Sequence, residues 1–343
     1  MKLGIIGLPG SGKSTVFQII THSTPDQWAQ KGSVIGTVQV PDDRVNTLSE
    51  LISPKKTVKA HLEYLLPRVS TSFGQGKNRD DGPWSDIRPC DALVHIVRNF
   101  LLPDNNPLRP KQDWRKLEEE MIFADFVVVE KRIERIDLDT KRGRKMNNQE
   151  RSLLEQCLEI LERGLPLRDR PDLATAPLLR GFSLLSAKPA LTVFNNDDED
   201  DGLPSWAETY PPATVVRGAL EREFADLPPD DRKAFMEAYN VAGSARKRLI
   251  HHSCQALGLI TFFTVVNHEV RSWLIPQGTK AVGAAEVIHT DMKKGFIRAE
   301  ILAFDDLVMA GTYQQAKKEA RVHMEGKDYV VRDGEVIYFR FNV

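Results

Sequence analysis

The chain has 343 residues, 41% of them hydrophobic and 28% charged, and its 47 basic and 48 acidic side chains leave a net charge of -1. This length is sufficient for two or three domains with separate hydrophobic cores. The balanced charge excludes a general electrostatic attraction to nucleic acid or to a membrane surface, so any such binding must come from local patches.

The first predicted element is a buried parallel strand over residues 3–6, and a helix is predicted over residues 15–21. The loop between them carries the pattern G-x-x-x-x-G-K-[ST] from Gly7 to Ser14, in the strand, loop and helix context that a phosphate-binding loop requires. Its glycines let main-chain amides and the positive end of the helix approach a triphosphate, while Lys13 adds a positive charge. Ser14 is the predicted magnesium ligand. The predicted nucleotide-binding residues of this loop are Pro9, Gly10, Ser11, Gly12, Lys13, Ser14 and Thr15.

Strand patterns and one short helix follow the loop. Residues 34–40 are predicted to form a strand, and residues 58–66 form a second strand-like run. Between them, Asp42 and Asp43 can cap a helix that ends before Pro54. The alternation of strands and helices therefore continues beyond the phosphate loop.

The rest of the first part of the chain repeats this alternation. Residues 70–85 are rich in Gly, Ser, Asp and Lys and are predicted to form a mobile loop, whereas residues 91–98 return to a buried strand. Residues 189–194 form another short strand pattern and lead into the acidic loop 195–201. Strands interleaved with helices over residues 1–257 indicate an α/β domain with a parallel sheet wound by helices.

This alternation is interrupted by a segment with helical spacing of its apolar residues. The spacing predicts two amphipathic helices between about residues 114 and 165, joined as a hairpin that buries both apolar stripes. The apolar positions are Leu117, Met121, Ala124 and Val128, and then Leu153, Cys157, Ile160 and Leu161. The tip, residues 141–145, is strongly basic, which is typical either of a solvated hairpin end or of a contact for RNA or another acidic partner.

From Gly258 the sequence changes to strand patterns, which predicts a separate small domain that is mainly β. The predicted strands are 260–266, 270–275, 296–303, 329–331 and 336–341. Asp333-Gly334 between the last two is a hairpin turn signal. The predicted domains are the first part of an α/β nucleotide-binding domain (1–113), an inserted helical hairpin (114–187), the second part of the α/β domain (188–257) and the C-terminal domain (258–343).

Four blocks in order resemble the YchF-type Obg-like ATPase family. They are GLPGSGKST, VPDDRVNTLSELISPKK, LLSAKPALTVFNNDDED, and the closing stretch from TVVNHEVRSWLIPQGTKAVGAAEVIHTDMKKGFIRAEI to EGKDYVVRDGEVIYFRFNV. The resemblance implies a P-loop G domain, an inserted helical hairpin and a C-terminal TGS domain. It also implies nucleotide hydrolysis, usually with ATP preferred, and association with ribosomes or RNA.

The chain departs from this family at the second switch. The family carries Asp-x-x-Gly there, whose aspartate supports magnesium and whose glycine amide senses the terminal phosphate. Leu66 and Val69 occupy these positions, and Pro67 removes a backbone donor beside them. We therefore expect nucleotide binding to persist while hydrolysis is slow or absent, and no catalytic residue is assigned. The acids available as substitutes are Asp80, Asp81 and Asp86, for which solvated loop charge is the simpler interpretation.

Base recognition is better preserved than the second switch. The family carries Asn-x-x-Glu in its base-recognition segment and accepts adenine there. Asn196 with Glu199 matches this spacing directly after a predicted strand. One step earlier, Asn195 with Asp198 has the guanine-type spacing without its lysine. We therefore predict ATP as the preferred nucleotide and keep GTP as the alternative. Gly218 and Ala219 resemble the family's final base-contacting loop, with Gly218 replacing the customary serine.

The C-terminal strands combine basic and aromatic residues. Lys293, Lys294 and Arg298 lie near Phe296, and residues 338–341 end the chain with the same mixture. Such a pattern is able to bind RNA through phosphate contacts and stacking. Alternation along strands favours core packing for about half of the aromatic residues.

The sequence thus predicts a nucleotide-binding switch protein that uses Mg2+ with ATP or GTP and acts on a ribosomal or RNA partner. The alternative is a ribosome- or RNA-binding module with a vestigial nucleotide site. Three widely spaced cysteines, Cys90, Cys157 and Cys254, predict free buried thiols in a reducing compartment. No apolar run reaches the roughly 18 residues of a membrane span, so we expect a cytoplasmic protein without membrane contact, and a monomer.

Overall fold

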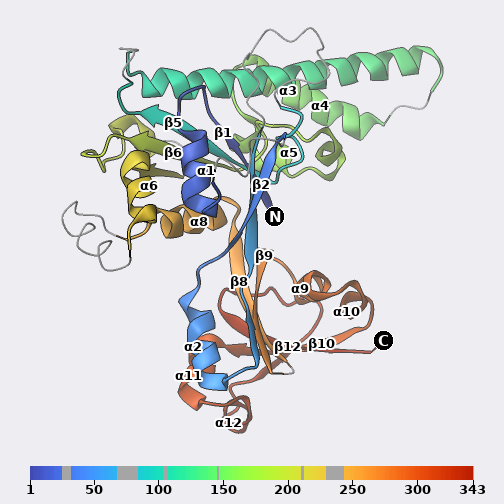
Figure 1. Cartoon of the computed structure of the whole chain (residues 1–343). Helices are drawn as coiled ribbons and strands as arrows, with labels where there is room; N and C mark the ends of the chain where they lie inside the picture. The colour runs from blue at the N-terminus through green and yellow to red at the C-terminus, as the bar shows by residue number, and fades with distance from the viewer. Residues whose placement is uncertain are drawn as a thin grey trace. The chain divides into compact units, whose positions relative to one another are not determined.

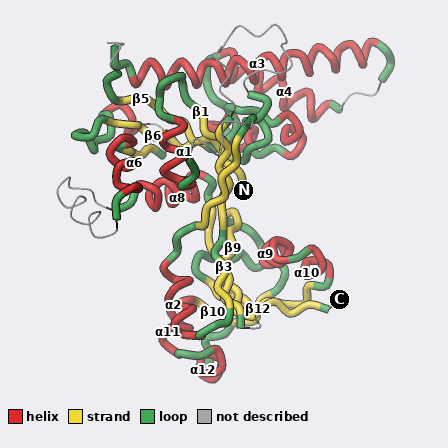
Figure 2. Tube along the Cα trace, in the orientation of Figure 1, coloured by secondary structure: helices red, strands yellow, loops and turns green. Residues whose placement is uncertain are grey.

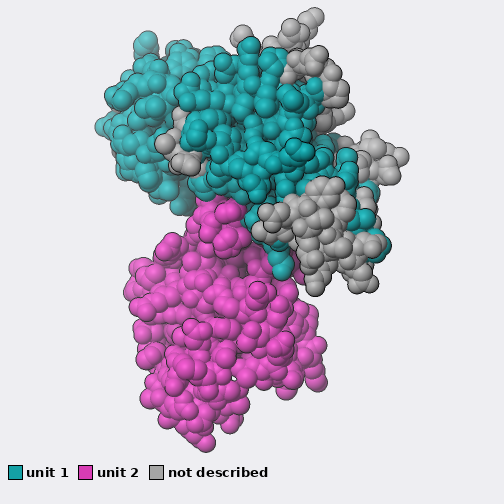
Figure 3. Space-filling model, turned by 90° about the vertical axis from the view of Figure 1, so that its left-hand side faces the viewer, with its two compact units in different colours: residues 1–36, 63–249 teal, residues 37–62, 250–343 magenta. Residues whose placement is uncertain are grey.

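The computed structural model describes residues 1–24, 32–67, 84–102, 107–144, 147–209, 212–228, 243–266 and 268–342. The chain forms two compact units, and each is built from two separate stretches of sequence (Figure 3). The first unit contains Met1–Gly36 and Glu63–Leu249, and the second contains Thr37–Leu62 and Ile250–Val343. Most of the loop predicted over residues 70–85 lies outside the described residues.

A six-stranded sheet forms the centre of the first unit (Figures 1 and 2). Its strand order is β2-β4-β1-β5-β6-β7. The strands are β1 (Lys2–Ile6), β2 (Val34–Gln39), β4 (His61–Leu66), β5 (Ala92–Asn99), β6 (Ala190–Asn196) and β7 (Ala213–Val216). β1 pairs in parallel with β4 and β5, and β6 pairs in parallel with β5 and β7. The predicted α/β fold class with a parallel sheet is therefore confirmed.

Helices cover both faces of this sheet (Figure 1). On one face lie α1 (Lys13–Thr21), which buries Val16, Phe17, Ile19 and Ile20, and α6 (Gly218–Asp226). On the other face α3 (Pro110–Lys141) packs Leu117 and Met121 against Ile6 and Leu93 of the sheet. This arrangement brings the phosphate loop, which follows β1, to the edge of the sheet where the parallel strands end.

The predicted helical hairpin consists of α3 and α4 (Asn148–Glu162). The Asn147 side chain caps α4 by accepting hydrogen bonds from the amides of Gln149 and Glu150. The shared core of the hairpin includes Ile122, Val129, Ile136, Leu154, Cys157, Ile160 and Leu161. The helical spacing therefore predicted both helices, although α3 begins at Pro110, before the expected start near residue 114.

One buried carboxylate fastens α3 to the segment that precedes β6. Asp125 is fully buried, and it accepts hydrogen bonds from the amides of Leu185 and Ser186 at 2.9 and 2.7 Å and from the Ser186 hydroxyl at 2.8 Å. Arg88 forms an ion pair with the same carboxylate at 3.2 Å. The hairpin is thus tied to the sheet by polar contacts as well as by apolar packing.

The second unit contains a mixed sheet in the order β11-β10-β12-β8-β9-β3. Its strands are β3 (Lys56–Val58), β8 (Leu259–Val266), β9 (Glu269–Pro276), β10 (Phe296–Ala303), β11 (His323–Glu325) and β12 (Glu335–Phe341). Its helices are α2 (Asp43–Ile52), α9 (Ala281–Ile288), α10 (Thr290–Lys294), α11 (Phe304–Ala310) and α12 (Tyr313–Lys318), and α8 (Ala245–Ala256) leads into the unit. The C-terminal part therefore contains more helix than the sequence predicted, while its TGS assignment stays a prediction.

The hairpin predicted around Asp333-Gly334 is wrong. Val330 forms only an isolated bridge with Lys280, and β12 pairs instead with β10 and β8. The turn is used for a tertiary contact, because the Asp333 carboxylate accepts a hydrogen bond from the Thr261 amide at 2.8 Å.

An early segment of the chain, residues 37–62, completes the second unit. Within it, α2 buries Val45 and Leu48 in a core shared with Phe263, Leu302 and Val336. β3 extends the sheet by pairing in parallel with β9. The sequence correctly predicted the cap of α2, because the Asp42 carboxylate accepts from the Arg44 amide at 3.0 Å.

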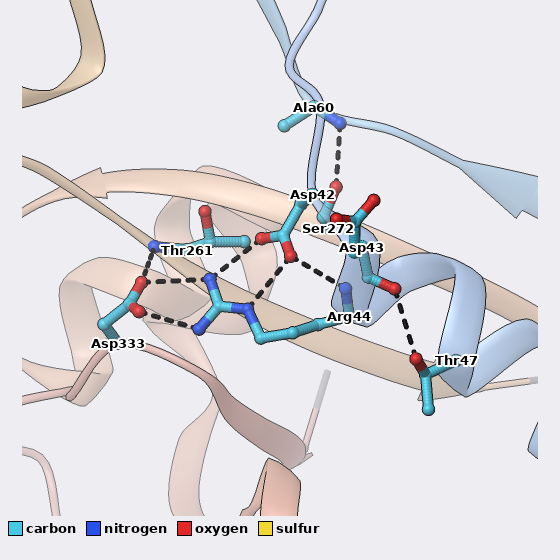
Figure 4. Close-up of polar contacts among 8 residues, drawn as sticks. All are labelled: Asp42, Asp43, Arg44, Thr47, Ala60, Thr261, Ser272 and Asp333. Atoms are coloured by element: carbon cyan, nitrogen blue, oxygen red, sulfur yellow. Dashed lines mark hydrogen bonds and ion pairs between the residues drawn. The ribbon is translucent and has the colours of Figure 1, made fainter. Parts of the chain in front are cut away.

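A polar network at the start of α2 strengthens this arrangement (Figure 4). The Arg44 guanidinium donates to Asp42 and also to Asp333, the latter at 2.7 Å. The Ala60 amide donates to the Ser272 hydroxyl at 2.8 Å.

No described helix of either unit is long and apolar enough to cross a membrane.

Candidate nucleotide-binding site

The phosphate loop has the backbone geometry that its glycines allow. Gly10 and Gly12 adopt φ angles of 78° and 91°, in the left-handed region that favours glycine. Gly12 is also the residue from which α1 starts, and a Cβ there would lie 2.1 Å from the Asn195 side-chain nitrogen. A Cβ at Gly7 would lie 2.5 Å from the Ile96 carbonyl oxygen. The loop is therefore packed tightly against β5 and β6 and leaves no room for side chains at these positions.

Lys13 lies folded over the loop. Its ammonium group donates to the carbonyl oxygens of Gly7 and Leu8, both at 2.8 Å. Burial lowers the pKa of this amine to about 8. The ammonium is therefore held over the loop by two neutral acceptors.

Ser14 and Thr15 open α1 directly after this lysine. Ser14 is exposed, and among the described residues its hydroxyl makes no hydrogen bond. A hydroxyl at this position fits a magnesium ligand, because hard cations prefer oxygen donors and keep several waters. Pro9 and Gly10 are exposed as well, so the outer face of the loop is accessible.

Asn195 connects the phosphate loop to the turn between β7 and α6. Its side-chain nitrogen donates to the Ser11 carbonyl at 3.2 Å, and its side-chain oxygen accepts from the Gly218 amide at 3.0 Å. Both contacts are buried. The predicted loop at Gly218 and Ala219 therefore joins the site, with Gly218 buried and Ala219 exposed.

The predicted pair Asn196 and Glu199 lies elsewhere. The Asn196 amide accepts from Asn99 at 3.0 Å and donates to the Gly202 carbonyl at 2.9 Å, and Glu199 is exposed. The structure brings Asn195 to the loop instead. The signal for Asn195 was present in the sequence as the guanine-type spacing one residue earlier.

Asp198 follows Asn195 by three residues and also turns toward α6. One oxygen of its carboxylate accepts from the Leu220 amide at 3.1 Å, and its carbonyl accepts from Arg217 at 3.2 Å. Asn195 and Asp198 thus both contact the turn that carries Gly218 and Ala219. This pair, which the sequence left as the alternative, forms one arrangement with the phosphate loop.

The second switch offers little to a metal ion among the described residues. Leu66 ends β4 and is buried, and Pro67 follows it. Val69, Asp80 and Asp81 lie outside the described residues. Asp86 is exposed and accepts a hydrogen bond from the Ser33 hydroxyl. The described part of the chain holds no cluster of three or more acidic, histidine or cysteine side chains that would bind a metal ion.

The basic patches are only partly free for a partner. At the hairpin tip Arg144 pairs with Asp139 at 2.9 Å, and Lys145 lies outside the described residues. In the second unit Lys293 pairs with Glu286 at 2.6 Å, and Arg340 pairs with Glu300 at 3.0 Å. Phe296 and Phe339 pack against each other in the core, as expected for about half of the aromatic residues.

Comparison with known proteins agrees with this geometry. A family model named YchF-GTPase_C, described as a protein of unknown function (DUF933), matches residues 259–342. The chain is 35% identical to the ribosome-binding ATPase YchF of Bacillus subtilis over 366 aligned residues, which cover 100% of both chains. The chain belongs to the YchF family. It is also 32% identical to the Pasteurella multocida ribosome-binding ATPase YchF, with 100% of this chain and 99% of that protein covered.

Solved structures show the same fold over the full length. The Schizosaccharomyces pombe YchF GTPase superposes with a TM-score of 0.81 at 26% identity, covering 99% of this chain and 97% of that one. A GTP binding protein from Pyrococcus horikoshii superposes with a TM-score of 0.62 at 16% identity, covering 100% of both chains, and is similar in fold alone. The predicted YchF membership is therefore confirmed.

Proposed function

We propose that this YchF-family chain binds a nucleoside triphosphate with Mg2+ at the phosphate loop and associates with the ribosome in a manner that depends on the nucleotide. The observation that carries the proposal is the loop itself, where Lys13 lies on the Gly7 and Leu8 carbonyls beside the open face of residues 9–10. Relatives that match the full chain are named ribosome-binding ATPases. Ribosome association would place the protein in the cytoplasm.

Binding follows from the groups on the loop. Phosphate oxygens would accept hydrogen bonds from the amides at the start of α1, and the Lys13 ammonium would move from two neutral carbonyls to the charged phosphates. Ser14 would hold Mg2+, which neutralises part of the phosphate charge. Asn195 would fix the position of the loop relative to the turn that carries Gly218, because its side chain is hydrogen-bonded to both.

Hydrolysis is expected to be slow. Leu66 stands where the family's second switch supplies an aspartate, and a buried leucine cannot orient a hydrated cation. Positioning and electrostatic stabilisation provide most of the catalysis in phosphoryl transfer. The loss of one support at the metal therefore lowers the rate without removing the binding site.

The base-recognition pair in this proposal is Asn195 with Asp198, which shifts the expected preference from ATP toward GTP. A carboxylate at Asp198 accepts from the N-H groups that guanine presents on its edge, whereas adenine presents an acceptor at the corresponding ring nitrogen. The Leu220 amide holds this carboxylate toward the α6 turn. We expect GTP to compete at least as well as ATP for the site.

The experiment is a titration with a fluorescent nucleotide, displaced by ATP or GTP in the presence of Mg2+. Lys13→Ala should abolish binding of both nucleotides. Asp198→Asn should lower the affinity for GTP by about tenfold or more, because it removes a charge-assisted acceptor. The affinity for ATP should fall much less. Glu199→Gln, a charge change of the same size on an exposed neighbour, is the matched control and should change neither affinity.

Ribosome association is tested in parallel by co-sedimentation with ribosomes, without nucleotide and with a non-hydrolysable triphosphate. A nucleotide-dependent change that disappears in Lys13→Ala supports the switch function. Retained sedimentation with no detectable nucleotide binding favours the alternative, a ribosome- or RNA-binding module with a vestigial nucleotide site.

A further inference from the structure

A cavity lies against the phosphate loop. It has a volume of about 200 Å³, and its walls come from the loop, from β5 and from the first turns of α3. The polar side chains that line it are Ser11, His95, Arg98, Asp113 and Lys116. The cavity therefore has room for a small ion together with water.

Three buried polar atoms on these walls have no hydrogen-bond partner in the part of the chain that the structure describes. They are the Ser11 hydroxyl, Nδ1 of His95 and one terminal nitrogen of Arg98. Ser11 and His95 are only 2% and 1% exposed. Buried polar groups are nearly always satisfied in native proteins, so the Ser11 hydroxyl and the Arg98 nitrogen are available to a group bound in this cavity.

Arg98 and His95 each have a neighbouring contact outside the cavity. The other terminal nitrogen of Arg98 donates to the Pro107 carbonyl at 3.3 Å, which leaves its first nitrogen directed elsewhere. Nδ1 of His95 lies 3.8 Å from a carboxylate oxygen of Glu118, within ion-pair distance. Glu118 is already engaged by Arg168 at 2.9 Å. Arg98 therefore retains one buried terminal nitrogen for a ligand, whereas Nδ1 of His95 lies near Glu118.

The charges of the lining select the class of ligand. Arg98 and Lys116 are cationic and Asp113 is anionic, while Ser11 and Arg98 supply donors. Charge-assisted hydrogen bonds from a guanidinium and a hydroxyl suit an oxyanion. The Asp113 carboxylate disfavours a multiply charged one. We propose that this cavity binds a small monovalent oxyanion, a carboxylate or singly charged phosphate, at a site separate from the nucleotide phosphates.

Such an anion would be linked to nucleotide binding, and this step rests on the proposed function. Ser11 belongs to both sites: its carbonyl accepts from Asn195 on one side, and its hydroxyl lies on the cavity wall on the other. An anion bound to the hydroxyl would hold the loop in the conformation that the nucleotide uses. Linkage then requires that nucleotide and anion raise each other's affinity by the same factor.

The test uses the full chain saturated with Mg2+ and a non-hydrolysable GTP analogue, so that the phosphate loop is filled. Acetate and inorganic phosphate are titrated separately at constant ionic strength and pH 6.5, and uptake is followed by calorimetry and by the melting temperature. The expected result is saturable binding of one anion per chain. Binding of acetate but not phosphate identifies a carboxylate site, and the reverse identifies a phosphate site.

Two variants locate the anion. Arg98→Gln should raise the dissociation constant of the anion by about tenfold or more, and Ser11→Ala, which barely alters volume, should raise it in the same direction. Lys111→Gln removes an exposed positive charge from the same helix outside the cavity and should have no effect. The proposal is overturned if neither acetate nor phosphate binds saturably. It is also overturned if an anion binds but its affinity changes in neither Arg98→Gln nor Ser11→Ala.

Failure of the anion site is distinguishable from failure of the nucleotide site. Should no nucleotide bind, the same titration is made on Lys13→Ala, whose phosphate loop lacks its ammonium. Anion binding that persists there and weakens with added Arg98→Gln supports the cavity independently. Anion binding that Lys13→Ala abolishes assigns the anion to the phosphate loop and overturns the proposal.

Discussion

Two glycines on different elements leave space for the side chain of Asn195. A Cβ at Gly12 would lie 2.1 Å from its nitrogen, and a Cβ at Gly218 would lie 2.5 Å from its oxygen. The amide consequently reaches main-chain groups on both sides, which a longer or shorter side chain would not do. The lack of a side chain at Gly218 therefore permits the close approach of Asn195 to the β7–α6 turn.

The first prediction compares Asn195→Ala with Asn196→Ala. Asn195→Ala removes the buried bonds to the Ser11 carbonyl and the Gly218 amide, so nucleotide affinity should fall by about tenfold or more. Asn196→Ala removes two bonds at the end of β6 away from the loop and should change affinity by less than about threefold. The measurement is a fluorescent-nucleotide titration on variants with matched far-ultraviolet circular dichroism. Equal losses in both variants would contradict the assignment of Asn195.

The second prediction concerns the protonation of Lys13. Burial lowers its pKa to about 8, so above pH 8 the amine is mostly neutral in the free protein. A bound triphosphate favours the ammonium form, and binding must then take up a proton. Affinity should fall as pH rises above 8, by up to about tenfold per pH unit.

Calorimetry in two buffers of different ionisation enthalpy measures this proton uptake. At pH 9 close to one proton per nucleotide should be taken up, and at pH 7 close to none from this group. A constant affinity between pH 7 and pH 9.5, with no buffer dependence at pH 9, would show that Lys13 stays charged in the free protein.

At the scale of elements, the buried Asp125 carboxylate is one of the polar attachments of α3, beside the pair of Glu118 with Arg168. Asp125 accepts from two amides and one hydroxyl, and burial raises its pKa although these bonds and Arg88 oppose the rise. The third prediction is that Asp125→Asn costs about 2–4 kcal/mol of unfolding free energy, because an amide group would present a donor to the Leu185 and Ser186 amides.

Urea unfolding of Asp125→Asn measures this loss. Glu134→Gln removes the charge of an exposed carboxylate on the same helix, so its unfolding free energy should stay within about 0.5 kcal/mol of the native value. A loss below about 1 kcal/mol in Asp125→Asn would mean that the hairpin is held mainly by its apolar contacts.

Sequence patterns predicted a helix or strand correctly where its formation depends on residues that are close together in the chain. The apolar spacing identified both helices of the hairpin, and Asp42 identified the start of α2. Leu117 and Met121 were expected to pack on the second helix of the hairpin, but they pack on the sheet. The turn at Asp333-Gly334 was misread because its carboxylate serves a tertiary bond to Thr261 and an ion pair with Arg44. Such partners lie far away in the sequence, so hairpin chemistry alone does not reveal them.

The site shows the same division between local and tertiary information. The phosphate loop is encoded within eight consecutive residues, so its place after β1 was predictable. Asn195 and Asn196 are adjacent at the end of β6, so their side chains point in different directions and only one of them reaches the phosphate loop. The contacts of Asn195 with Ser11 and Gly218, which lie on two other elements, show which one it is.

At the scale of the whole molecule, the order of segments in the chain differs from their grouping in space. Residues 37–62 lie between two stretches of the first unit in sequence, yet their apolar side chains complete the core of the second. Periodicity predicts that α2 has a buried face but does not tell which sheet covers it. The nucleotide-binding unit and the C-terminal unit are therefore each incomplete as continuous stretches of sequence.

The fourth prediction tests this grouping with Leu48→Ala. Leu48 is fully buried beside Phe263, Leu302 and Val336, so its truncation should cost about 2–5 kcal/mol of stability in the second unit. Hydrogen–deuterium exchange should therefore rise in β8, β10 and β12, which lie more than 200 residues later in the chain, while β5 and β6 keep their protection.

Leu93→Ala is the matched control, because Leu93 is equally buried but lies in the core of the first unit. It should raise exchange in β5 and β6 and leave β8, β10 and β12 protected. Saturating nucleotide should then restore part of the protection in Leu93→Ala, since a ligand stabilises the unit that binds it. Equal exchange patterns in the two variants would mean that the chain unfolds as one cooperative body, in which the position of a core residue no longer determines where protection is lost.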